Sequence, residues 1–394
     1  AFLQQMVVAV KVFKKTTPNG KVTVYLGKRD FIDHLDHTDP IDGVVVVDDG
    51  YLQNRRIYGQ VLMVYRYGRE DDEVMGVRFS KEMVIASDQI APAKKEKQNL
   101  TPIQEKLVKK MGPNAYPFTF QFPEMAPCSV TLQPGEDDHG KPLGVEYYVK
   151  CYVAANEEDK GHKRSTVQLA IKKLQYAPQI KGLTRLPSSL VSKGFTFSSG
   201  KINLEVTLDK DIYYHGEKIG ANLTITNNSR KQVRNIKVYV VQHCEATWKP
   251  AKAAPSPPGA SFTKVVYLVP LASSNKDRRG VALDGRLRDD DANLASSTLV
   301  PEGKCPIDAI GIVISYSLRV KLNCGNLGGE LVTDVPFKLL HPAPGTIEKE
   351  RALALKKMRS LDKARYEQSF TNDDEDNIVF EDFARFRLSR DELE

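Results

Sequence analysis

Charged side chains crowd the stretch Asp277–Asp291. Five acids and four arginines fall within these fifteen residues, with Asp284 near the middle. Carboxylates and guanidinium groups at this density either stay solvated on a surface loop or pair with one another inside the protein. Gly280 and Gly285 punctuate the stretch and Asn293 follows it, which is typical of an ordered loop. Taken alone, the pattern favours a solvated loop, so the surrounding sequence must decide.

The composition is that of an ordinary globular chain with a modest positive charge. Its 394 residues suggest two or three domains, and 41% hydrophobic with 27% charged residues is usual for soluble proteins. The net charge of +7 favours anionic partners. The sequence has no zinc-ligand spacing, no RNP-like aromatic run and no long basic arm, so we expect no nucleic-acid partner.

The cysteines and the apolar runs indicate the compartment. An odd number of scattered cysteines fits a reduced, cytosolic protein better than a disulfide framework. They are Cys128, Cys151, Cys244, Cys305 and Cys324. No run of 18 apolar residues predicts a membrane span. Residues 1–5 lack signal-peptide features, and we interpret Met6 as a candidate initiator and residues 1–5 as an extension of unknown origin.

Alternation of apolar and polar residues dominates both halves of the chain and predicts many short strands. The alternating runs lie at 8–13, 21–27, 202–208, 221–225 and 236–240. Turn signals such as Pro18-Asn19-Gly20 and Asn227-Asn228 separate them. Short strands with such punctuation predict antiparallel β-sandwiches, so the expected fold class is all-β.

One helix is predicted after residue 100. Thr101 provides an N-cap, Pro102 occupies the first helical position, and Gln104 completes a capping box. Gly112 is expected to end the helix. Its apolar stripe has four-residue spacing and consists of Ile103, Leu107 and Met111. By itself such a stripe indicates ordinary core packing rather than a switch.

The chain divides into three parts. The turn-rich segment 177–200 separates two strand-rich halves, and the strand pattern stops near Gly345. We therefore expect domains at 1–177 and 178–347 and a tail at 348–394. The tail has a basic piece at 351–365 and an acidic piece at 373–382, with apolar residues inside the acidic piece that need a binding surface.

Several motifs together resemble the arrestin family from end to end. They are Val12-Phe13-Lys14-Lys15, Gly27–His34, Tyr65–Gly76, Ile212–Glu217, Ala282-Leu283-Asp284-Gly285 and Phe380–Arg385. The sequence at 187–195 and the acidic residues at 373–376 are most similar to arthropod visual arrestins of the phosrestin type. The resemblance implies two antiparallel β-sandwich domains with the C-terminal tail folded back on the first. It also implies a cytoplasmic visual arrestin that moves to rhabdomere membranes, binds light-activated phosphorylated opsin and blocks its coupling to G protein.

In that family a buried ionic cluster, the polar core, holds the inactive state. The resemblance assigns it to Asp30, Lys172, Asp284, Asp291 and Arg385. A phosphorylated receptor tail brings about −1.5 to −2 charges per phosphate, competes for Lys172 and expels the acidic tail. Many relatives have arginine at the position of Lys172. Lysine lacks the planar fork that binds phosphate at two points, so we predict a latch that demands less phosphate.

The resemblance implies a second restraint, in which the first strand, the helix and the tail pack together. Its residues would be Val12, Phe13, Ile103, Leu107, Met111, Ile378, Val379 and Phe380. Receptor phosphates would be collected by Lys14, Lys15, Arg29, Lys109, Lys110, Lys163 and Arg164, each of which alone is most simply a solvated surface charge. The finger loop that enters the receptor would include Asp71, Asp72, Val74, Met75 and Gly76.

Further partners follow from the same resemblance. Phe380, Phe383 and Arg387 match the pattern that binds the appendage of the clathrin adaptor complex, whereas no leucine-rich clathrin box is evident. An inositol phosphate or phosphoinositide membrane is a weakly indicated ligand of Arg230, Lys231, Arg234, Lys237, Arg319 and Lys321. No other cofactor is expected. Three leucines in turn-like segments, Leu186, Leu190 and Leu327, are candidates for contact with the membrane edge, and the proline-rich segment 244–263 is shorter than usual for the family.

Other classes of function are less well supported. An enzyme is not expected, because no nucleophile motif or phosphate-binding loop is present. His34 and His37 with Asp33 and Asp36 could mimic a metal cluster, but the resemblance gives them a structural role. The main alternative is an arrestin-like cargo adaptor in endocytic sorting. An extracellular adhesion sandwich conflicts with the unpaired cysteines and the missing signal.

Overall fold

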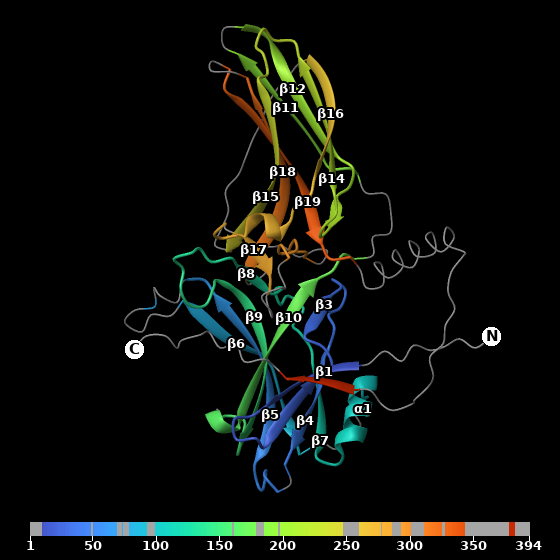
Figure 1. Cartoon of the computed structure of the whole chain (residues 1–394), viewed down its shortest axis with the longest axis vertical. Coiled ribbons are helices and arrows are strands. Elements are labelled where there is room, and N and C mark those ends of the chain that lie inside the picture. The colour runs from blue at the N-terminus through green and yellow to red at the C-terminus, as the bar shows by residue number, and fades with distance from the viewer. Residues whose placement is uncertain are drawn as a thin grey trace, which may run out of the picture.

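The computed structural model places two β-rich bodies end to end along the long axis of the molecule (Figure 1). It describes residues 10–48, 50–68, 73, 79–92, 99–159, 161–178, 185–195, 198–246, 260–276, 278–285, 293–300, 311–324, 328–342 and 378–382. The all-β expectation is confirmed, since strands alternate with short turns through both halves. No helix among the described residues is long and apolar enough to cross a membrane.

The first body is a sandwich whose smaller sheet contains the end of the chain. The strands follow the order β20 (Ile378–Asp382), β1 (Val10–Thr16), β2 (Val22–Leu26), β4 (Ile41–Val47) and β7 (Ala115–Phe120). The predicted alternation at Val22, Val24 and Leu26 is confirmed, because these three side chains are buried while their neighbours are half-exposed. β20 is therefore an added edge strand on a sheet that is otherwise built from the first third of the chain.

The larger sheet of this sandwich carries Asp30, Asp33, Lys172, Lys173 and Asp284. Its strands are β3 (Asp30–Asp33), β5 (Arg56–Arg66), β6 (Ser80–Ala91), β8 (Val130–Leu132), β9 (Gly144–Ala154), β10 (Thr166–Gln175) and β17 (Ala282–Asp284). Aliphatic and aromatic side chains from both sheets fill the space between them, including Phe31, Phe118 and Tyr147. Burial of such side chains contributes about 1.5–3 kcal/mol each to the stability of the sandwich.

The second body is a sandwich of two four-stranded sheets. One has the order β11 (Ser188–Phe195), β12 (Ser198–Leu208), β14 (Ile219–Asn227) and β16 (Ala260–Leu268). The other has the order β13 (Ile212–Tyr214), β19 (Glu330–Leu340), β18 (Ile312–Asn323) and β15 (Asn235–Ala246). The inward side chains of β12 and β14 are buried as their alternation predicts. Of the segment 244–263, residues 247–259 lie outside the described residues.

Helix α1 (Pro102–Met111) confirms the helix prediction in detail. Thr101 accepts a hydrogen bond from the Gln104 backbone N–H, and the Gln104 side chain accepts one from the Thr101 N–H, which completes the capping box. Gly112 ends the helix with a φ of 80°, a value that favours glycine. Gln104 is itself buried and its Nε2 donates to the carbonyls of Gly43 and Phe118, so the cap also attaches the helix to the sheet.

The two bodies meet where a strand from the second half of the chain enters a sheet of the first. β17 pairs with β8, with Asp284 opposite Val130 in the register. A second connection joins the end of β10 to the end of β19, where the N–H of Ala177 donates to the carbonyl of His341. Short 3₁₀ turns occupy Lys163–Ser165 (η1) and Ala272–Asn275 (η2). Within the described residues, Cys128, Cys151, Cys244 and Cys324 are free thiols.

Candidate functional site

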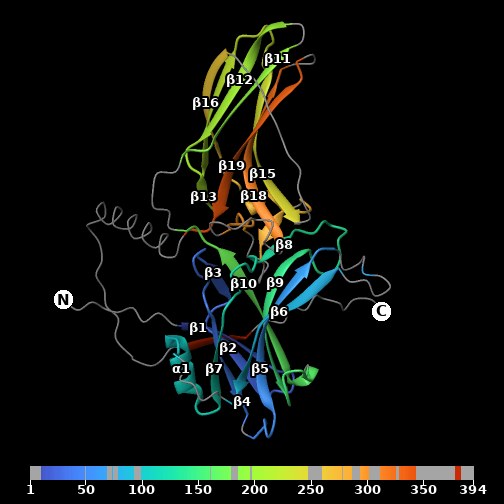
Figure 2. The same cartoon turned by 180° about the vertical axis from the view of Figure 1, so that it is seen from behind.

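The C-terminal strand β20 lies parallel to β1 along the edge of the first sandwich. The register runs from Val10 opposite Ile378 to Lys14 opposite Asp382, with Val12 opposite Phe380. Figures 1 and 2 show β20 beside β1 from both sides of the molecule. The tail is thus held by main-chain pairing over five residue pairs, which sequence patterns alone did not predict.

The helix and the first strand pack together as the predicted restraint requires. Val12 and Leu107 are both fully buried in one small apolar cluster, against which Ile103 and Met111 also pack. Gly27 lies under the helix, because a Cβ at this position would come within 3.1 Å of the Ile103 side chain. Phe13 is half-exposed with the guanidinium of Arg29 over its ring at 5.5 Å. The strand that receives the tail is therefore fixed from one side by α1.

Lys172 and Asp30, two of the five residues that the resemblance assigns to the polar core, form an ion pair. β10 runs parallel to β3 with Lys172 opposite Asp30, and Lys172 Nζ lies 3.7 Å from Asp30 Oδ1. The lysine side chain is 10% exposed and the aspartate 53% exposed. The backbone N–H of Lys172 also donates to the carbonyl of Arg29 at 2.9 Å. The pair is open to solvent on the side of its carboxylate, so an incoming anion can reach it.

Asp284 is buried, but its partners in the described part of the chain are histidines. Its Oδ2 lies 2.7 Å from His341 Nε2 and 4.0 Å from His215 Nε2. Its Oδ1 accepts a hydrogen bond from the Ser296 N–H at 3.0 Å. Among the ion pairs between described residues, none joins Asp284 to Lys172. Sequence reasoning did not identify either histidine, because neither has a local pattern that distinguishes it from a turn or strand residue.

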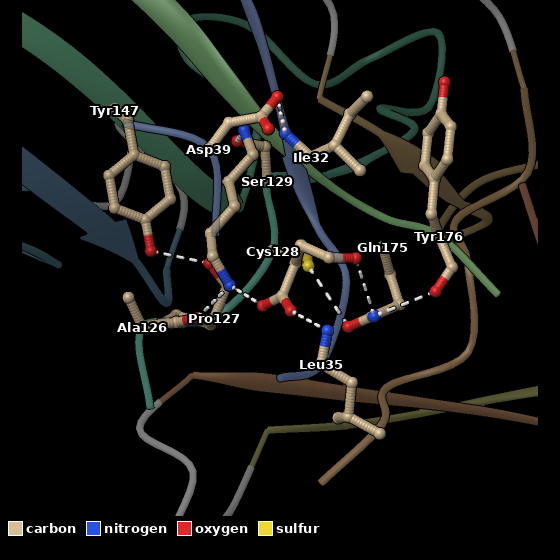
Figure 3. A network of polar contacts seen from close by, with 12 residues as sticks. Ile32, Leu35, Asp39, Ala126, Pro127, Cys128, Ser129, Tyr147, Gln175 and Tyr176 are labelled. Atoms are coloured by element: carbon tan, nitrogen blue, oxygen red, sulfur yellow. Dashed lines mark hydrogen bonds and ion pairs between the residues drawn. The ribbon is translucent and has the colours of Figure 1, made fainter. Parts of the chain in front are cut away.

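The neighbouring Lys173 forms a second ion pair that the sequence analysis also missed. Its side chain is 1% exposed, and its Nζ donates to Asp33 Oδ2 and, at 2.8 Å, to the Ala126 carbonyl. Figure 3 shows the surrounding network, in which Tyr147 donates to the Pro127 carbonyl at 2.6 Å.

The rest of this network seals the Lys173–Asp33 pair. The backbone N–H of Leu35 donates to Asp33 Oδ1 at 2.8 Å, and Gln175 Nε2 donates to the Asp33 carbonyl. Burial raises the pKa of the adjacent Cys128 thiol to about 12, which keeps it protonated. Because every charge here is enclosed and hydrogen-bonded, the pair is suited to holding structure rather than to exchanging partners.

Six of the seven predicted phosphate-binding cations lie on β1, α1 and η1, and the seventh, Arg29, lies just before β3. Lys14 and Lys15 are on β1, and Lys15 Nζ donates to the Gln168 carbonyl of β10 at 2.7 Å. Arg29 immediately precedes β3 and is linked to β10 through the Lys172 N–H. The remaining four are exposed, at the last turn of α1 and on η1: Lys109, Lys110, Lys163 and Arg164. The Arg164 carbonyl accepts from the Asn19 N–H, so η1 lies against the turn after β1.

The finger-loop residues themselves fall outside the described residues, but the base of the loop is clear. Asp71, Asp72, Val74, Met75 and Gly76 are not among the described positions. At the base, the N–H of Tyr67 donates to the Phe79 carbonyl and the two rings meet edge to face at 6.0 Å. Arg66, which is 8% exposed, pairs with Glu73 at 2.7 Å. The described residues that flank these positions are therefore joined by hydrogen bonds and an ion pair.

Two of the six cations assigned to phosphoinositide are already neutralised. Arg319 donates to both oxygens of Asp334 at 2.7 and 2.8 Å, and Lys321 pairs with Glu330. Lys237 lies opposite Lys321 in the register of β15 and β18. The others, Arg230, Lys231 and Arg234, belong to the segment between β14 and β15. Leu186 and Leu190 are 50% and 62% exposed, whereas Leu327 lies outside the described residues.

Other predicted residues cannot be placed. Asp291, Phe383, Arg385 and Arg387 lie outside the described residues, and of Ile378, Val379 and Phe380 only the backbone pairing is described. The His34 and His37 rings stack on one another at 4.4 Å, and their nearest carboxylates are Asp39 and Asp36. Among the described residues they do not form a metal-binding group with Asp33.

Comparisons with known proteins match both halves of the chain. The profile of "Arrestin (or S-antigen), N-terminal domain" matches residues 22–177, and that of "Arrestin (or S-antigen), C-terminal domain" matches residues 198–344. An "Arrestin homolog" of Locusta migratoria is 71% identical, with 98% of each chain covered. "Phosrestin-1" of Drosophila melanogaster is 61% identical with the same coverage, and "Arrestin, lateral eye" of Limulus polyphemus is 51% identical over 97% of this chain and 96% of that protein.

These matches agree with the two sandwiches. They also bear out the expectation that the protein is not an enzyme, since arrestins regulate signalling without catalysing a reaction. With identity above 60% over almost the whole length of two relatives, the resemblance of motifs becomes an assignment. The chain belongs to the arrestin family.

Proposed function

We propose that this arrestin binds light-activated, phosphorylated opsin and blocks its coupling to G protein. One relative is named as an arrestin of the lateral eye and another as a phosrestin, which supports a visual role. The proposed mechanism rests on the pairing of β20 with β1. The same strand β1 also contains Lys14 and Lys15. The binding surface for receptor phosphates and the docking site of the tail thus share one strand.

Competition between the tail and a phosphorylated segment follows from that arrangement. β20 is an edge strand, so its release leaves the main-chain groups of β1 unpaired along the same edge. An extended receptor segment can pair with that edge in place of β20. Its phosphates would then lie near Lys14 and Lys15, and each charge-assisted hydrogen bond contributes about 1.5–3 kcal/mol.

The half-open ion pair of Lys172 provides the electrostatic part of the switch. Lys172 Nζ lies 3.7 Å from the Asp30 carboxylate, which is 53% exposed. A phosphate carries more negative charge than a carboxylate and can displace Asp30 from Lys172. We infer that this displacement loosens β10 from β3, with Asp291 and Arg385 completing the polar core in the inactive state. Release of the tail then frees the two sandwiches to rotate and the finger loop to enter the receptor.

Sedimentation with photoreceptor membranes, in light and in dark, tests this function. The double variant Lys14→Gln/Lys15→Gln is expected to bind phosphorylated, illuminated membranes at least about tenfold more weakly, because two phosphate contacts are lost. Lys106→Gln, an exposed lysine on α1, is the matched control and is expected to bind as wild type. Equal binding by the double variant and the control would contradict the assignment of β1. The Arg385→Glu variant is expected to bind more readily than wild type.

Two further partners are proposed, the appendage of a clathrin adaptor and an inositol phosphate or phosphoinositide membrane. The adaptor-binding pattern Phe380, Phe383 and Arg387 begins inside β20, so β20 must leave β1 before an adaptor appendage can bind it as a helix. Capture of the appendage is therefore expected only from activated protein, and capture by the resting protein would contradict this coupling. An inositol phosphate or phosphoinositide membrane is proposed at Arg230, Lys231, Arg234, Lys237, Arg319 and Lys321, where Arg319 and Lys321 would exchange their acidic partners for phosphate.

The alternative is a sorting adaptor that lacks receptor desensitisation. Pull-down with active opsin against sorting-coat subunits separates the two functions. We expect capture by opsin, in a manner that depends on light. Capture by coat subunits alone would favour the adaptor.

A further inference from the structure

Three side chains that could ligate a metal converge where the two sandwiches meet. They are His215, in the turn after β13, Asp284 at the end of β17, and His341 directly after β19. One ligand atom from each lies within 4.8 Å of the other two. Within the described part of the chain, no other set of three or more histidine, cysteine or carboxylate side chains comes together in this way.

The distances fit a cation after small movements of the side chains. Asp284 Oδ2 is 2.7 Å from His341 Nε2 and 4.0 Å from His215 Nε2. Zinc holds imidazole nitrogen and carboxylate oxygen at about 2.0–2.2 Å, so neighbouring ligands of a tetrahedral ion lie about 3.3 Å apart. The two observed spacings, 2.7 and 4.0 Å, lie on either side of this ligand-to-ligand distance. The imidazole rings are close as well, with their centroids 4.5 Å apart and tilted by 51°.

Burial and charge favour a cation at this place. The side chains of Asp284, His215 and His341 are only 8%, 11% and 15% exposed. A buried carboxylate between imidazoles offers the mixed nitrogen and oxygen donors that zinc accepts.

The surroundings supply the outer contacts that a metal site needs. The Ser296 N–H donates to Asp284 Oδ1, which leaves Oδ2 directed at the histidines. Ser296 Oγ lies 3.0 Å from His215 Nε2 and would give up this contact when that nitrogen binds the ion. A cavity of about 50 Å³ is lined by Asp284, Ser296, Cys128 and Lys173, among others. This cavity borders Asp284 but neither histidine, so solvent water would supply the fourth ligand of a tetrahedral ion.

We propose that His215, Asp284 and His341 bind one Zn²⁺ ion per chain, with water as the fourth ligand. The ion joins parts of the protein that an arrestin must hold in the resting state. Asp284 lies on the strand that enters the sheet of the first sandwich, and the His341 ring stacks on Tyr176 at 5.4 Å, where the first sandwich ends. Zinc at this place ties the β17 segment to both histidines and stabilises the resting arrangement of the two sandwiches.

Zinc content after equilibrium dialysis of the purified full-length protein tests the proposal directly. Wild type is expected to retain one Zn²⁺ per chain. His215→Gln and His341→Gln are each expected to weaken binding by about 100-fold or more, since loss of an outer-shell contact alone costs 10–100-fold. The matched control is His243→Gln, which removes a partly buried histidine that contacts Ser317 Oγ at 2.9 Å elsewhere in the second sandwich. Zinc is also expected to raise the melting temperature of wild type and His243→Gln only.

X-ray absorption of zinc-loaded wild type keeps the test independent of how well the variants fold. We expect two imidazoles and oxygen ligands around the ion. A wild type that retains no zinc, a first shell without two imidazoles, or unchanged zinc content in both histidine variants would overturn the site. These measurements use no opsin, so they stand apart from the proposed receptor function. A loss of light-dependent membrane binding would leave the zinc result unaffected.

Discussion

Lys172 and Lys173 are adjacent on β10 and both pair with an aspartate from the β3 strand, yet they differ in exposure. Lys173 is 1% exposed and its partner Asp33 is 14% exposed. Lys172 is 10% exposed, but its partner Asp30 is 53% exposed and lies 3.7 Å away. Both lysine side chains are buried, so the main difference lies in the exposure of the paired aspartates.

The difference separates a structural ion pair from a switchable one. A sealed pair such as Lys173–Asp33 cannot exchange its partner without leaving a charge buried. A pair with one exposed carboxylate has little net stability to lose, and a stronger anion can replace that carboxylate. A receptor phosphate is therefore expected to act on Lys172 and to leave Lys173 undisturbed.

Breaking the sealed pair is expected to have the largest effect on stability. Lys173→Met leaves Asp33 buried without its cation, and removing one partner of such a pair costs about 3–5 kcal/mol. Urea unfolding, followed by intrinsic fluorescence and circular dichroism, measures the change. The double variant Lys173→Met/Asp33→Leu is the control and should recover much of the loss. If Lys173→Met is as stable as wild type, the Lys173–Asp33 pair is not enclosed as described.

The next largest effect on stability is expected from the apolar packing between α1 and β1. Leu107 is fully buried between α1 and the sheet, so Leu107→Ala should lower the free energy of unfolding by about 2–5 kcal/mol. It should also loosen β1 and make the C-terminal tail more sensitive to protease. Lys106→Ala, at an exposed position of the same helix, is expected to change neither property. If the tail of Leu107→Ala is cleaved at the wild-type rate, the packing of α1 against β1 does not help to hold the tail in place.

The helix cap should have a smaller effect. Thr101→Ala removes the hydroxyl that accepts from the Gln104 N–H, and loss of such a cap costs about 1 kcal/mol. Thr101 Oγ1 also donates to Asp42 at 2.6 Å, so the loss should not fall below that value. Thr101→Ser keeps both contacts and should unfold at the same urea concentration as wild type.

The switchable pair should change stability least and function most. Lys172→Gln is expected to alter the free energy of unfolding by about 0–1 kcal/mol, because the Asp30 carboxylate is largely solvated. Its binding to illuminated opsin without phosphates should rise above that of wild type. Lys172→Arg introduces a planar fork and should increase the dependence on phosphate. A destabilisation of Lys172→Gln that matches Lys173→Met would remove the distinction between the two lysines.

Local signals in the sequence were sufficient to predict several elements. The Thr101, Gln104 and Gly112 signals mark the helix at both ends, and the alternation in β2, β12 and β14 predicts which side chains are buried. These features depend on neighbours within a few residues. The motifs that resemble arrestins then indicated the fold, the visual function and the pairing of Asp30 with Lys172.

Contacts between distant segments were not predictable in the same way. Nothing near Lys173 indicates that it, rather than Lys172, is the enclosed lysine, because the choice depends on the strand register with β3. His215 and His341 meet Asp284 only because β13 pairs with β19 and β17 enters the other sheet. The docking of the tail as a parallel strand on β1 depends equally on tertiary structure.

Hydrogen exchange at the amides of Ile378–Asp382 tests the central claim most directly. The account predicts slow exchange in the resting protein, since β20 pairs with β1 over its whole length, and fast exchange when a phosphorylated opsin-tail peptide is added. The unphosphorylated peptide should leave exchange slow. Fast exchange at these amides in the resting protein, or slow exchange that persists with saturating phosphopeptide, would contradict a latch released by phosphate.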